Sequence, residues 1–340
     1  MIPCYNAERS VKTAIGSITA QTHRRLQIIA VDDGSEDRTR DVLRSIAKQD
    51  RRVEIVDLGK NEGIVRALNS GIQCAVGDFI ARMDADDFAL PERLSEQLRW
   101  MAENKLDLCG TAILEYGLPL GWNRTFSFPP TPEEINAHLL FQNSIFHPTL
   151  LARREVFENF QYRAEYQYAE DYDLFARASA CYRLGNHPAA LLKYRRHRGQ
   201  ISQHKAANVQ AARIRVQREL LAARGIECTA GEIAVHAMIR GSTSIIRISD
   251  LEAIEAWLSK LIRLHEDPVA QNVIRSQWIR ACLRSGPLGL KAWRMFRGSP
   301  LYSQRPGSQI DAINVLFVTA LRLAYQGVAF RTLARFALAG

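Results

Sequence analysis

The sequence lacks the cysteine patterns of metal-bound or disulfide-linked proteins. Its 340 residues include six cysteines, but they are scattered and no two form a C-x-x-C pair. This spacing argues against a structural zinc site and against a disulfide framework. Mostly apolar flanking residues instead predict reduced, buried cysteines in a cytoplasmic protein.

Several other signatures are missing. There is no signal peptide, Gly/Ser-rich linker or fixed-period repeat. In the C-terminal third the longest uncharged apolar run, residues 312–321, is far shorter than the ~20 residues of a membrane span. No G-x-G-x-x-G follows a candidate strand, which disfavours a dehydrogenase. What remains is a chain with 47% apolar residues, enough for one globular domain and a substantial appendage.

Acidic residues are nearly absent from the C-terminal end. Residues 1–205 hold 27 Lys+Arg and 27 Asp+Glu, and residues 206–269 hold 8 of each. Residues 270–340 hold 10 Lys+Arg and only Asp311, so the whole net charge of +9 lies there. Such a surface favours an anionic partner, either phospholipid headgroups or nucleic acid. A solvated basic face without a partner is the alternative.

The first ninety residues alternate between strand and helix patterns. Residues 26–31 (LQIIAV) form a continuous apolar run typical of a buried strand, and residues 53–58 and 79–83 are further candidate strands. Helical spacing lies between them, for instance at residues 64–75. The opening residues 1–6 resemble the end of a strand whose beginning lies upstream. This alternation predicts a parallel, doubly wound α/β sheet that binds ligands at the carboxyl ends of its strands.

The remainder divides near residue 205. Up to there we expect a helix from Pro91 to about residue 103, an irregular loop at 119–132, and further elements: strands at 106–115, 145–152 and 187–195, and a helix at 171–180. Beyond it the pattern is helical, with segments at 206–224, 229–239, 250–265, 268–285 and 310–338.

Acidic residues follow three of the candidate strands. They are Asp32-Asp33, the cluster Asp84-Ala85-Asp86-Asp87, and Glu170-Asp171. Carboxylates gathered at one end of a sheet repel one another unless a cation neutralises them. Hard oxygen ligands suit Mg²⁺ or Mn²⁺, which can neutralise charge on a diphosphate. For any single site, the alternative is an ordinary acidic turn or helix cap.

With these motifs the chain resembles the family 2 glycosyltransferases of the GT-A fold. The resemblance covers about residues 1–204. Its matching stretches, in order, are IPCYNAE, SITAQTHRRLQIIAVDDGSEDRT, NEGIVRALNSGI, GDFIARMDADDFALPERLSEQ, HPT, AEDYDLFARAS and LLKYRRHRGQIS. It implies a GT-A catalytic domain at residues 1–205, with a mixed, mainly parallel sheet flanked by helices. The α-helical, basic region 206–340 carries no matching motif.

The resemblance also implies roles for the nucleotide-binding residues. Pro3, Tyr5 and Asp33 match positions that hold the base, where Asp33 would accept a hydrogen bond from a uracil imide and Tyr5 would stack. The alternatives are a turn or cap for Asp33 and core packing for Tyr5. Arg66 matches a possible phosphate contact, although a solvated helix face explains it equally well.

For the chemical step, the resemblance points to Asp84, Asp86, Asp171 and Glu170. Asp86 matches the direct metal ligand, and Asp84 matches a ligand of the ribose or of the metal shell. Asp171 matches the general base that takes the acceptor hydroxyl's proton, with Glu170 orienting the acceptor or Asp171. A plain acidic residue at a helix N-terminus is the alternative for Asp171.

A basic segment would complete the site. In the resemblance, Arg196 and His197 belong to a segment that closes over the diphosphate, and an exposed basic loop is the alternative. His147, a lone histidine before proline, is more consistent with a structural role at a strand end.

These expectations together predict an inverting, metal-dependent glycosyltransferase. Its donor would be a nucleotide-sugar, for which we expect a UDP-sugar among the UDP-, GDP- and dTDP-sugars that the resemblance implies, and its acceptor a glycan or lipid-linked hydroxyl. We expect a cytoplasmic enzyme with possible peripheral membrane contact through residues 270–340. A catalytically inactive nucleotide-sugar-binding scaffold is the first rival. A nucleic-acid-binding protein is disfavoured, because no reader motif is present.

Overall fold

The computed structural model describes residues 1–117, 123–196, 205–303, 309–327 and 330. They form two compact units. One contains Met1–Leu139 and Asn143–Val216, and the other contains Leu140–Gln142 and Gln217–Gly340. The helical character expected after residue 206 is confirmed, and the division between the units lies within α9 (Ala206–Ala223). Within the described residues, no helix combines the length and apolarity needed to cross a bilayer.

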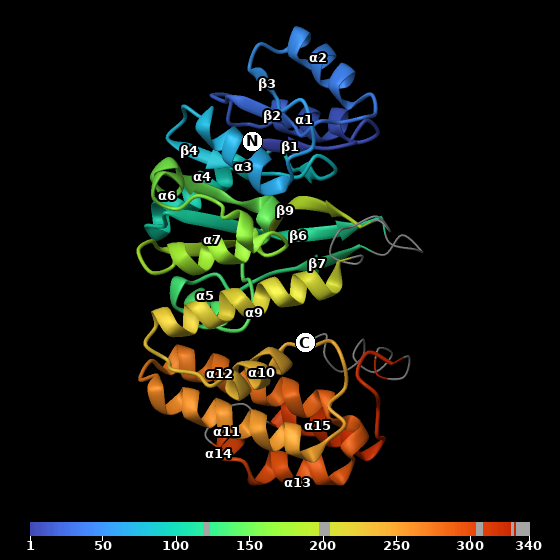
Figure 1. Ribbon diagram of the computed structural model, residues 1–340, viewed down its shortest axis with the longest axis vertical. Helices are drawn as coiled ribbons and strands as arrows, with labels where there is room; N and C mark the ends of the chain where they lie inside the picture. The colour runs from blue at the N-terminus through green and yellow to red at the C-terminus, as the bar shows by residue number, and fades with distance from the viewer. Residues whose placement is uncertain (118–122, 197–204, 304–308, 328–329, 331–340) are drawn as a thin grey trace. The chain divides into compact units, whose positions relative to one another are not determined.

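The first unit begins with three parallel strands (Figure 1), which are β1 (Ile2–Cys4), β2 (Ile28–Asp32) and β3 (Val53–Asp57) in the order β1-β2-β3. The helices between them are α1 (Val11–Thr19), α2 (Thr39–Gln49) and α3 (Ile64–Gln73). Ile28 and Ala30 pack in one core cluster with residues of α1 and α2, whereas Ile29 and Val31 pack with Ala67 of α3. Because side chains alternate along a strand, the apolar run of β2 fills both faces.

The second sheet of this unit is mixed. It comprises β4 (Phe79–Ala81), β5 (Phe88–Ala89), β6 (Leu108–Tyr116), β7 (Arg124–Phe126), β8 (Leu151–Arg153) and β9 (Leu184–Arg195). Its order is β4-β8-β6-β9-β5, with β7 paired to β6. Only β6 and β9 pair in parallel; the other pairs are antiparallel. The expected α/β fold is therefore confirmed; among the strands of the described residues, parallel pairing joins β1 to β2, β2 to β3 and β6 to β9.

Two backbone hydrogen bonds connect the two sheets. The amino group of Met1 donates to the carbonyl oxygen of Ala81 at 2.9 Å, and Met83 donates to the carbonyl oxygen of Met1 at 3.2 Å. The end of β4 and the start of the loop that follows it therefore lie beside Met1, directly before β1.

The helices and short turns of this unit cover the second sheet and lead to α9. They are α4 (Arg93–Asn104), α5 (Pro132–Leu139), η2 (His147–Thr149), α6 (Arg154–Asn159), η3 (Ala164–Tyr166) and α7 (Glu170–Ala178). The prediction of an irregular loop at 119–132 is wrong at residues 124–126, which form β7. The prediction of a strand at 145–152 is wrong at residues 147–149, which form η2. His147 and Pro148 form a turn there because the Thr149 N–H bonds the Phe146 carbonyl at 2.9 Å.

The second unit contains α10 (Ala230–Ile239), α11 (Ile248–Leu264), α12 (Pro268–Arg284), η4 (Gly286–Leu288), α13 (Leu290–Gly298), α14 (Pro300–Ser303) and α15 (Gln309–Ala320). The helix expected over 310–338 is wrong at residues 321–327; Phe330 is helical, and the remainder of that range lies outside the described residues. Arg322 has φ +50°, its N–H bonds the Thr319 carbonyl at 3.2 Å, and the N–H of Leu323 bonds the Val318 carbonyl at 3.0 Å. This hydrogen-bond pattern is a Schellman motif, which ends a helix.

Candidate active site

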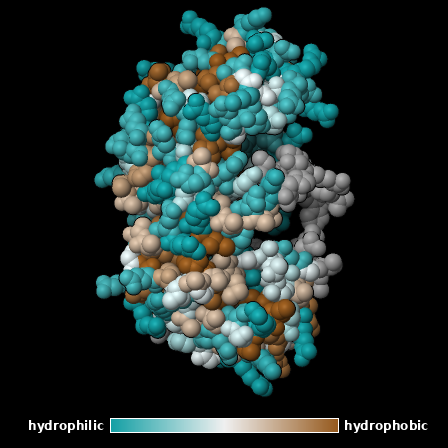
Figure 2. Space-filling model, in the orientation of Figure 1, coloured by the Kyte–Doolittle hydropathy of each residue, from teal (hydrophilic) through white to brown (hydrophobic). Residues whose placement is uncertain are grey.

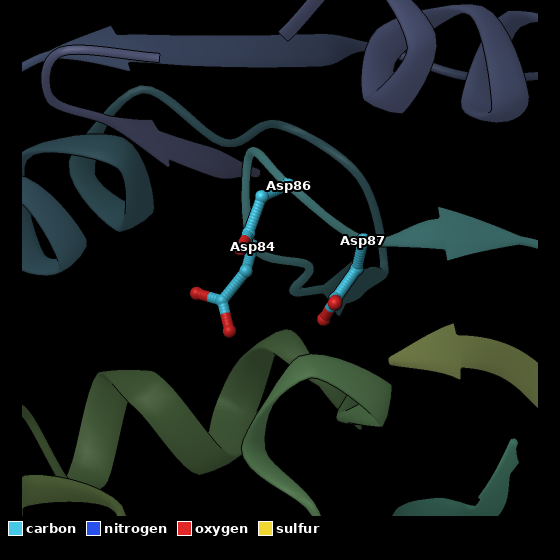
Figure 3. A group of neighbouring side chains, drawn as sticks. All are labelled: Asp84, Asp86 and Asp87. Carbon is cyan, nitrogen blue, oxygen red and sulfur yellow. The ribbon is translucent and has the colours of Figure 1, made fainter. Parts of the chain in front are cut away.

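The acidic cluster Asp84, Asp86 and Asp87 occupies the loop between β4 and β5. One ligand oxygen from each carboxylate can be chosen so that all three lie within 4.8 Å of one another. In Figure 3 the side chains of Asp84 and Asp87 point away from the blue strands and toward the green helical ribbon. An all-carboxylate set at this spacing has the chemistry of a Mg²⁺ or Mn²⁺ site.

Asp87 is the most deeply buried of the three, with 1% of its surface exposed. Its Oδ1 accepts a hydrogen bond from the Arg195 backbone N–H at 3.0 Å, whereas its buried Oδ2 has no partner. Burial, and then the charge of Asp84, raise the pKa of Asp87 to about 9. The negative charge of the ionised Asp87 carboxylate would be uncompensated in this buried position. A bound cation would supply the opposing positive charge.

Arg82 carries a buried positive charge directly before the cluster. Its Nη2 lies 2.6 Å from Oδ1 of Asp84. Burial disfavours the charged guanidinium, but Asp84, Tyr162 and Glu170 together raise the pKa of Arg82 above its usual value. A single cation thus interacts with the acidic loop and with the acids of α7.

Glu170 and Asp171 begin α7. Asp171 accepts hydrogen bonds from the Asn143 amide at 2.6 Å and from the Tyr172 backbone N–H at 2.7 Å. Burial raises the pKa of Asp171, while the Tyr172 N–H, Arg82 and Arg213 oppose that rise. The amide and the helix N-terminus orient this carboxylate and offset part of the effect of burial.

Glu170 differs from its neighbour, because its buried Oε2 has no hydrogen-bond partner. Burial first, and then the charge of Asp171, raise the pKa of Glu170 to about 7, while Arg82 opposes the rise. Burial is the main cause that raises the pKa of the Tyr162 hydroxyl, and Asp171, Glu170 and Asp84 raise it further. Tyr162 therefore lies within electrostatic reach of both acidic sites.

A cavity of about 210 Å³ lies beside Tyr162. Its wall is formed by α3, the residues before it and the η3 segment, and its lining includes Glu62, Gly63, Arg66, Asn69, Tyr162 and Gln167. Asp33 holds the entrance to α3 in place, because its two carboxylate oxygens accept the backbone N–H groups of Glu62 at 2.7 Å and Gly63 at 3.0 Å. Burial raises the pKa of Asp33, and these two hydrogen bonds oppose that rise.

Comparison with known proteins agrees with this geometry. Residues 1–160 match the model of the family described as glycosyl transferase family 2. An uncharacterized glycosyltransferase of Haemophilus influenzae is 33% identical over 217 residues, covering 59% of this chain and 66% of that protein. The chain belongs to glycosyl transferase family 2.

Other members of the family and one solved fold are also similar. The putative glycosyltransferase EpsH of Bacillus subtilis is 30% identical and matches over 50% of this chain and 52% of its own length. The amylovoran biosynthesis glycosyltransferase AmsE of Erwinia amylovora is 26% identical over 74% of this chain and 95% of AmsE. The crystal structure of S. aureus TarS 1-349 has a TM-score of 0.56 at 15% identity, covering 86% of this chain and 90% of that one. The GT-A fold is thereby confirmed.

In this family 2 glycosyltransferase, two of the three acidic sites share one electrostatic environment through Arg82 and Tyr162. The third acidic site, Asp32-Asp33, has its ion-pair and hydrogen-bond partners within the protein. Asp32 pairs with Arg40 at 2.9 Å, and Asp33 caps the entrance to α3. The capping alternative for Asp33 therefore describes its contacts, and donor binding by Asp33 stays a prediction.

The other predicted donor residues take varied positions. Pro3 is buried in β1 and Tyr5 is 45% exposed just beyond it. Arg66 lines the cavity and pairs with Glu62 at 3.2 Å. Arg196 lies 3.7 Å from the Glu115 carboxylate, and His197 falls outside the described residues. The structural role predicted for His147 agrees with its burial and its 2.7 Å hydrogen bond to the Tyr162 hydroxyl.

Sequence reasoning missed Arg82, Asn143 and Tyr162. A signal for Arg82 was present, because it is the only charge in the strand segment FIARM before the acidic loop. A lone charge inside a buried strand needs a partner of opposite charge, and the aspartates Asp84, Asp86 and Asp87 come directly after this strand in the sequence. Asn143 and Tyr162 carry no such signal, since their roles depend on loops that only the folded chain brings to α7.

Proposed function

We propose that this family 2 glycosyltransferase catalyses inverting transfer of a sugar from a UDP-sugar to an acceptor hydroxyl. The acceptor would be a glycan or a lipid-linked glycan, in polysaccharide or glycolipid assembly in the cytoplasm. One observation carries the proposal: the buried guanidinium of Arg82 interacts with the acidic loop through Asp84 and with the acids of α7 through Glu170. The carboxylate proposed for the donor half, Asp84, and the one proposed for the acceptor half, Glu170, therefore interact with the same guanidinium.

The donor half would be built by Pro3, Tyr5, Asp33, Arg66 and the acidic loop. AmsE and TuaG are described as amylovoran and putative teichuronic acid biosynthesis glycosyltransferases. TarS 1-349 has been solved with UDP-GlcNAc. These descriptions concern those proteins, and they motivate UDP-sugars as the first donors to test. Arg196 and His197 would add positive charge beside the diphosphate.

A divalent cation fits the acidic loop on the chemistry of its donors. Asp86 and Asp84 would hold Mn²⁺ or Mg²⁺, and the unpartnered Oδ2 of Asp87 lies in the same cluster. When bound, the ion supplies positive charge against the diphosphate leaving group. Arg82 places a further positive charge beside this loop, because it forms a 2.6 Å ion pair with Asp84.

The acceptor half would use Asp171 as general base. Its carboxylate takes the proton of the acceptor hydroxyl as that oxygen forms a bond to the anomeric carbon. The bond from the anomeric carbon to the diphosphate breaks on the opposite face, so the configuration inverts and a nucleoside diphosphate leaves. Asn143 orients Asp171 through its 2.6 Å hydrogen bond, and Glu170 would help to orient the acceptor.

The test is a donor panel. The full chain is incubated with UDP-, GDP- and dTDP-sugars, with and without Mn²⁺, and release of the nucleoside diphosphate is measured. We expect release from a UDP-sugar that requires the metal and is lost in Asp86→Ala. Donor binding without release from any donor would favour the inactive scaffold. Metal-independent release would overturn the metal assignment.

A further inference from the structure

Helix α15 is apolar on two opposite faces. Ala312, Val315, Val318 and Thr319 are buried on one face. Large apolar side chains between 39% and 68% exposed occupy the other face and the residue after the helix; they are Ile310, Ile313, Leu316, Phe317 and Leu321. At 100° per residue these five positions fall in one continuous arc. Solvent-exposed apolar residues gathered in this way mark an interaction surface rather than random exposure.

The apolar arc continues onto α13, which packs against α15. Gly289, directly before α13, lies close to Arg322, directly after α15. A β-carbon at Gly289 would be only 3.1 Å from Nε of Arg322. Leu290, which is 53% exposed, and the exposed Lys291 follow this glycine directly. Figure 2 shows brown, apolar residues among teal and white ones on the visible face of the helical unit. We call these five α15 residues and Leu290 the α15 patch.

Basic side chains lie on the helix next to α15 and directly after α15 itself. Lys291, Arg294 and Arg297 are exposed on α13, and Arg322 follows α15 directly. The sequence from residue 270 to the end holds ten Lys+Arg and one acid. We call Lys291, Arg294, Arg297 and Arg322 the basic rim. A partner that suits both the patch and the basic rim has an apolar interior and a negatively charged surface.

We propose that the α15 patch docks on an anionic phospholipid membrane, with the apolar side chains entering the interface and the basic rim meeting the headgroups. A second copy of the chain would fit less well. A twofold dimer places the same surface on both partners, so the basic rims would face each other and repel. The helix would lie in the plane of the membrane, since it has 12 residues and cannot span it.

The test is flotation of the full chain with vesicles. Phosphatidylcholine vesicles containing phosphatidylglycerol are compared with pure phosphatidylcholine vesicles, at low and high salt. We expect binding to the anionic vesicles that weakens with salt. The double variant Ile313→Glu/Phe317→Glu should bind about tenfold more weakly or not at all. Lys291→Glu/Arg294→Glu should lose the preference for anionic lipid.

The matched control is Val76→Glu, which places a carboxylate at a 73% exposed apolar residue of the other unit and should bind like the parent protein. Circular dichroism melting identifies any variant that fails to fold, and the charge-reversal pair then supplies an independent test. Equal binding by the control and the Ile313/Phe317 double variant would overturn the proposal. So would dimerisation in solution that this double variant abolishes. Binding to vesicles needs no sugar donor, so either result is independent of the proposed transferase activity.

Discussion

Arg82 and Asp84 form an ion pair, with Nη2 of the arginine 2.6 Å from Oδ1 of the aspartate, in which the arginine side chain is 5% exposed and the aspartate side chain 31%. The buried guanidinium also interacts electrostatically with Tyr162 and Glu170. A guanidinium in this position is costly to bury, but its charge favours the ionised forms of Glu170 and Asp171. The pH dependence of the enzyme should therefore depend on Arg82.

Replacing Arg82 with methionine should move the acidic limb of the rate profile to higher pH. Arg82 lowers the pKa of both Glu170 and Asp171, so its loss raises the pH at which these acids ionise. We expect a shift of about 1–2 pH units, while Arg82→Lys keeps most of the parent profile. Product release measured from pH 5 to 9 checks this. An unchanged limb in Arg82→Met would show that the two acidic sites are not coupled.

Glu170 should destabilise the folded protein at alkaline pH. Its pKa is raised from 4.5 to about 7, so its stabilising contribution is present below pH 4.5 and is lost as pH rises through 7. Glu170→Gln should therefore increase the free energy of unfolding by about 1–3 kcal/mol at pH 8 relative to pH 5. Denaturant unfolding at the two pH values, without added metal, measures the difference. An equal effect at both would contradict the shift.

Asp171→Asn should abolish the chemistry while sparing the fold. The amide keeps the size of the side chain and its oxygen can still accept from Asn143, but it cannot take a proton. We expect kcat to fall by about 10²–10⁴-fold with little change in donor affinity. Single-turnover transfer and calorimetric donor binding separate the two effects. Full activity in Asp171→Asn would transfer the base role to another group.

Asp86 and Asp87 should respond differently to loss of charge. Asp86→Ala removes a predicted metal ligand, and we expect Mn²⁺ binding and transfer to fall by about 100-fold. Asp87→Asn imitates the protonated carboxyl favoured by its pKa of about 9 and keeps the acceptor for Arg195. Its melting temperature should match the parent. Titration calorimetry with Mn²⁺ ranks the two variants, and the opposite ranking would move the metal ligand to Asp87.

Asp33→Ala should weaken the fold and the donor site together. It removes the acceptor for two backbone N–H groups at the entrance to α3, at a cost of about 1–2 kcal/mol. Asp33→Asn retains one carbonyl oxygen and should lose less stability. If Asp33 also contacts the base, UDP affinity falls in both variants. If only stability changes, Asp33 is a cap alone.

Much of the first unit follows from local patterns. The run at residues 26–31 predicted β2, because a strand covered on both faces needs apolar side chains at every position. Helical spacing at residues 64–75 likewise predicted α3. The mixed second sheet was not predictable, because the antiparallel pairing of β4 with β8 joins residues about seventy positions apart. Likewise the end of α15 depended on a single left-handed residue, Arg322, with no glycine to indicate it.

The sequence by itself determined the family and the identity of the acidic side chains, since strand ends and motif order are local properties of the chain. Only the tertiary structure decided which carboxylates share an environment. Asp33 is occupied by backbone N–H groups, whereas Asp84 and Glu170 are joined by one buried guanidinium. The physical reason is that sequence periodicity depends only on residues that are neighbours along the chain. Charges instead interact through space, with any group that the fold brings close and shields from water.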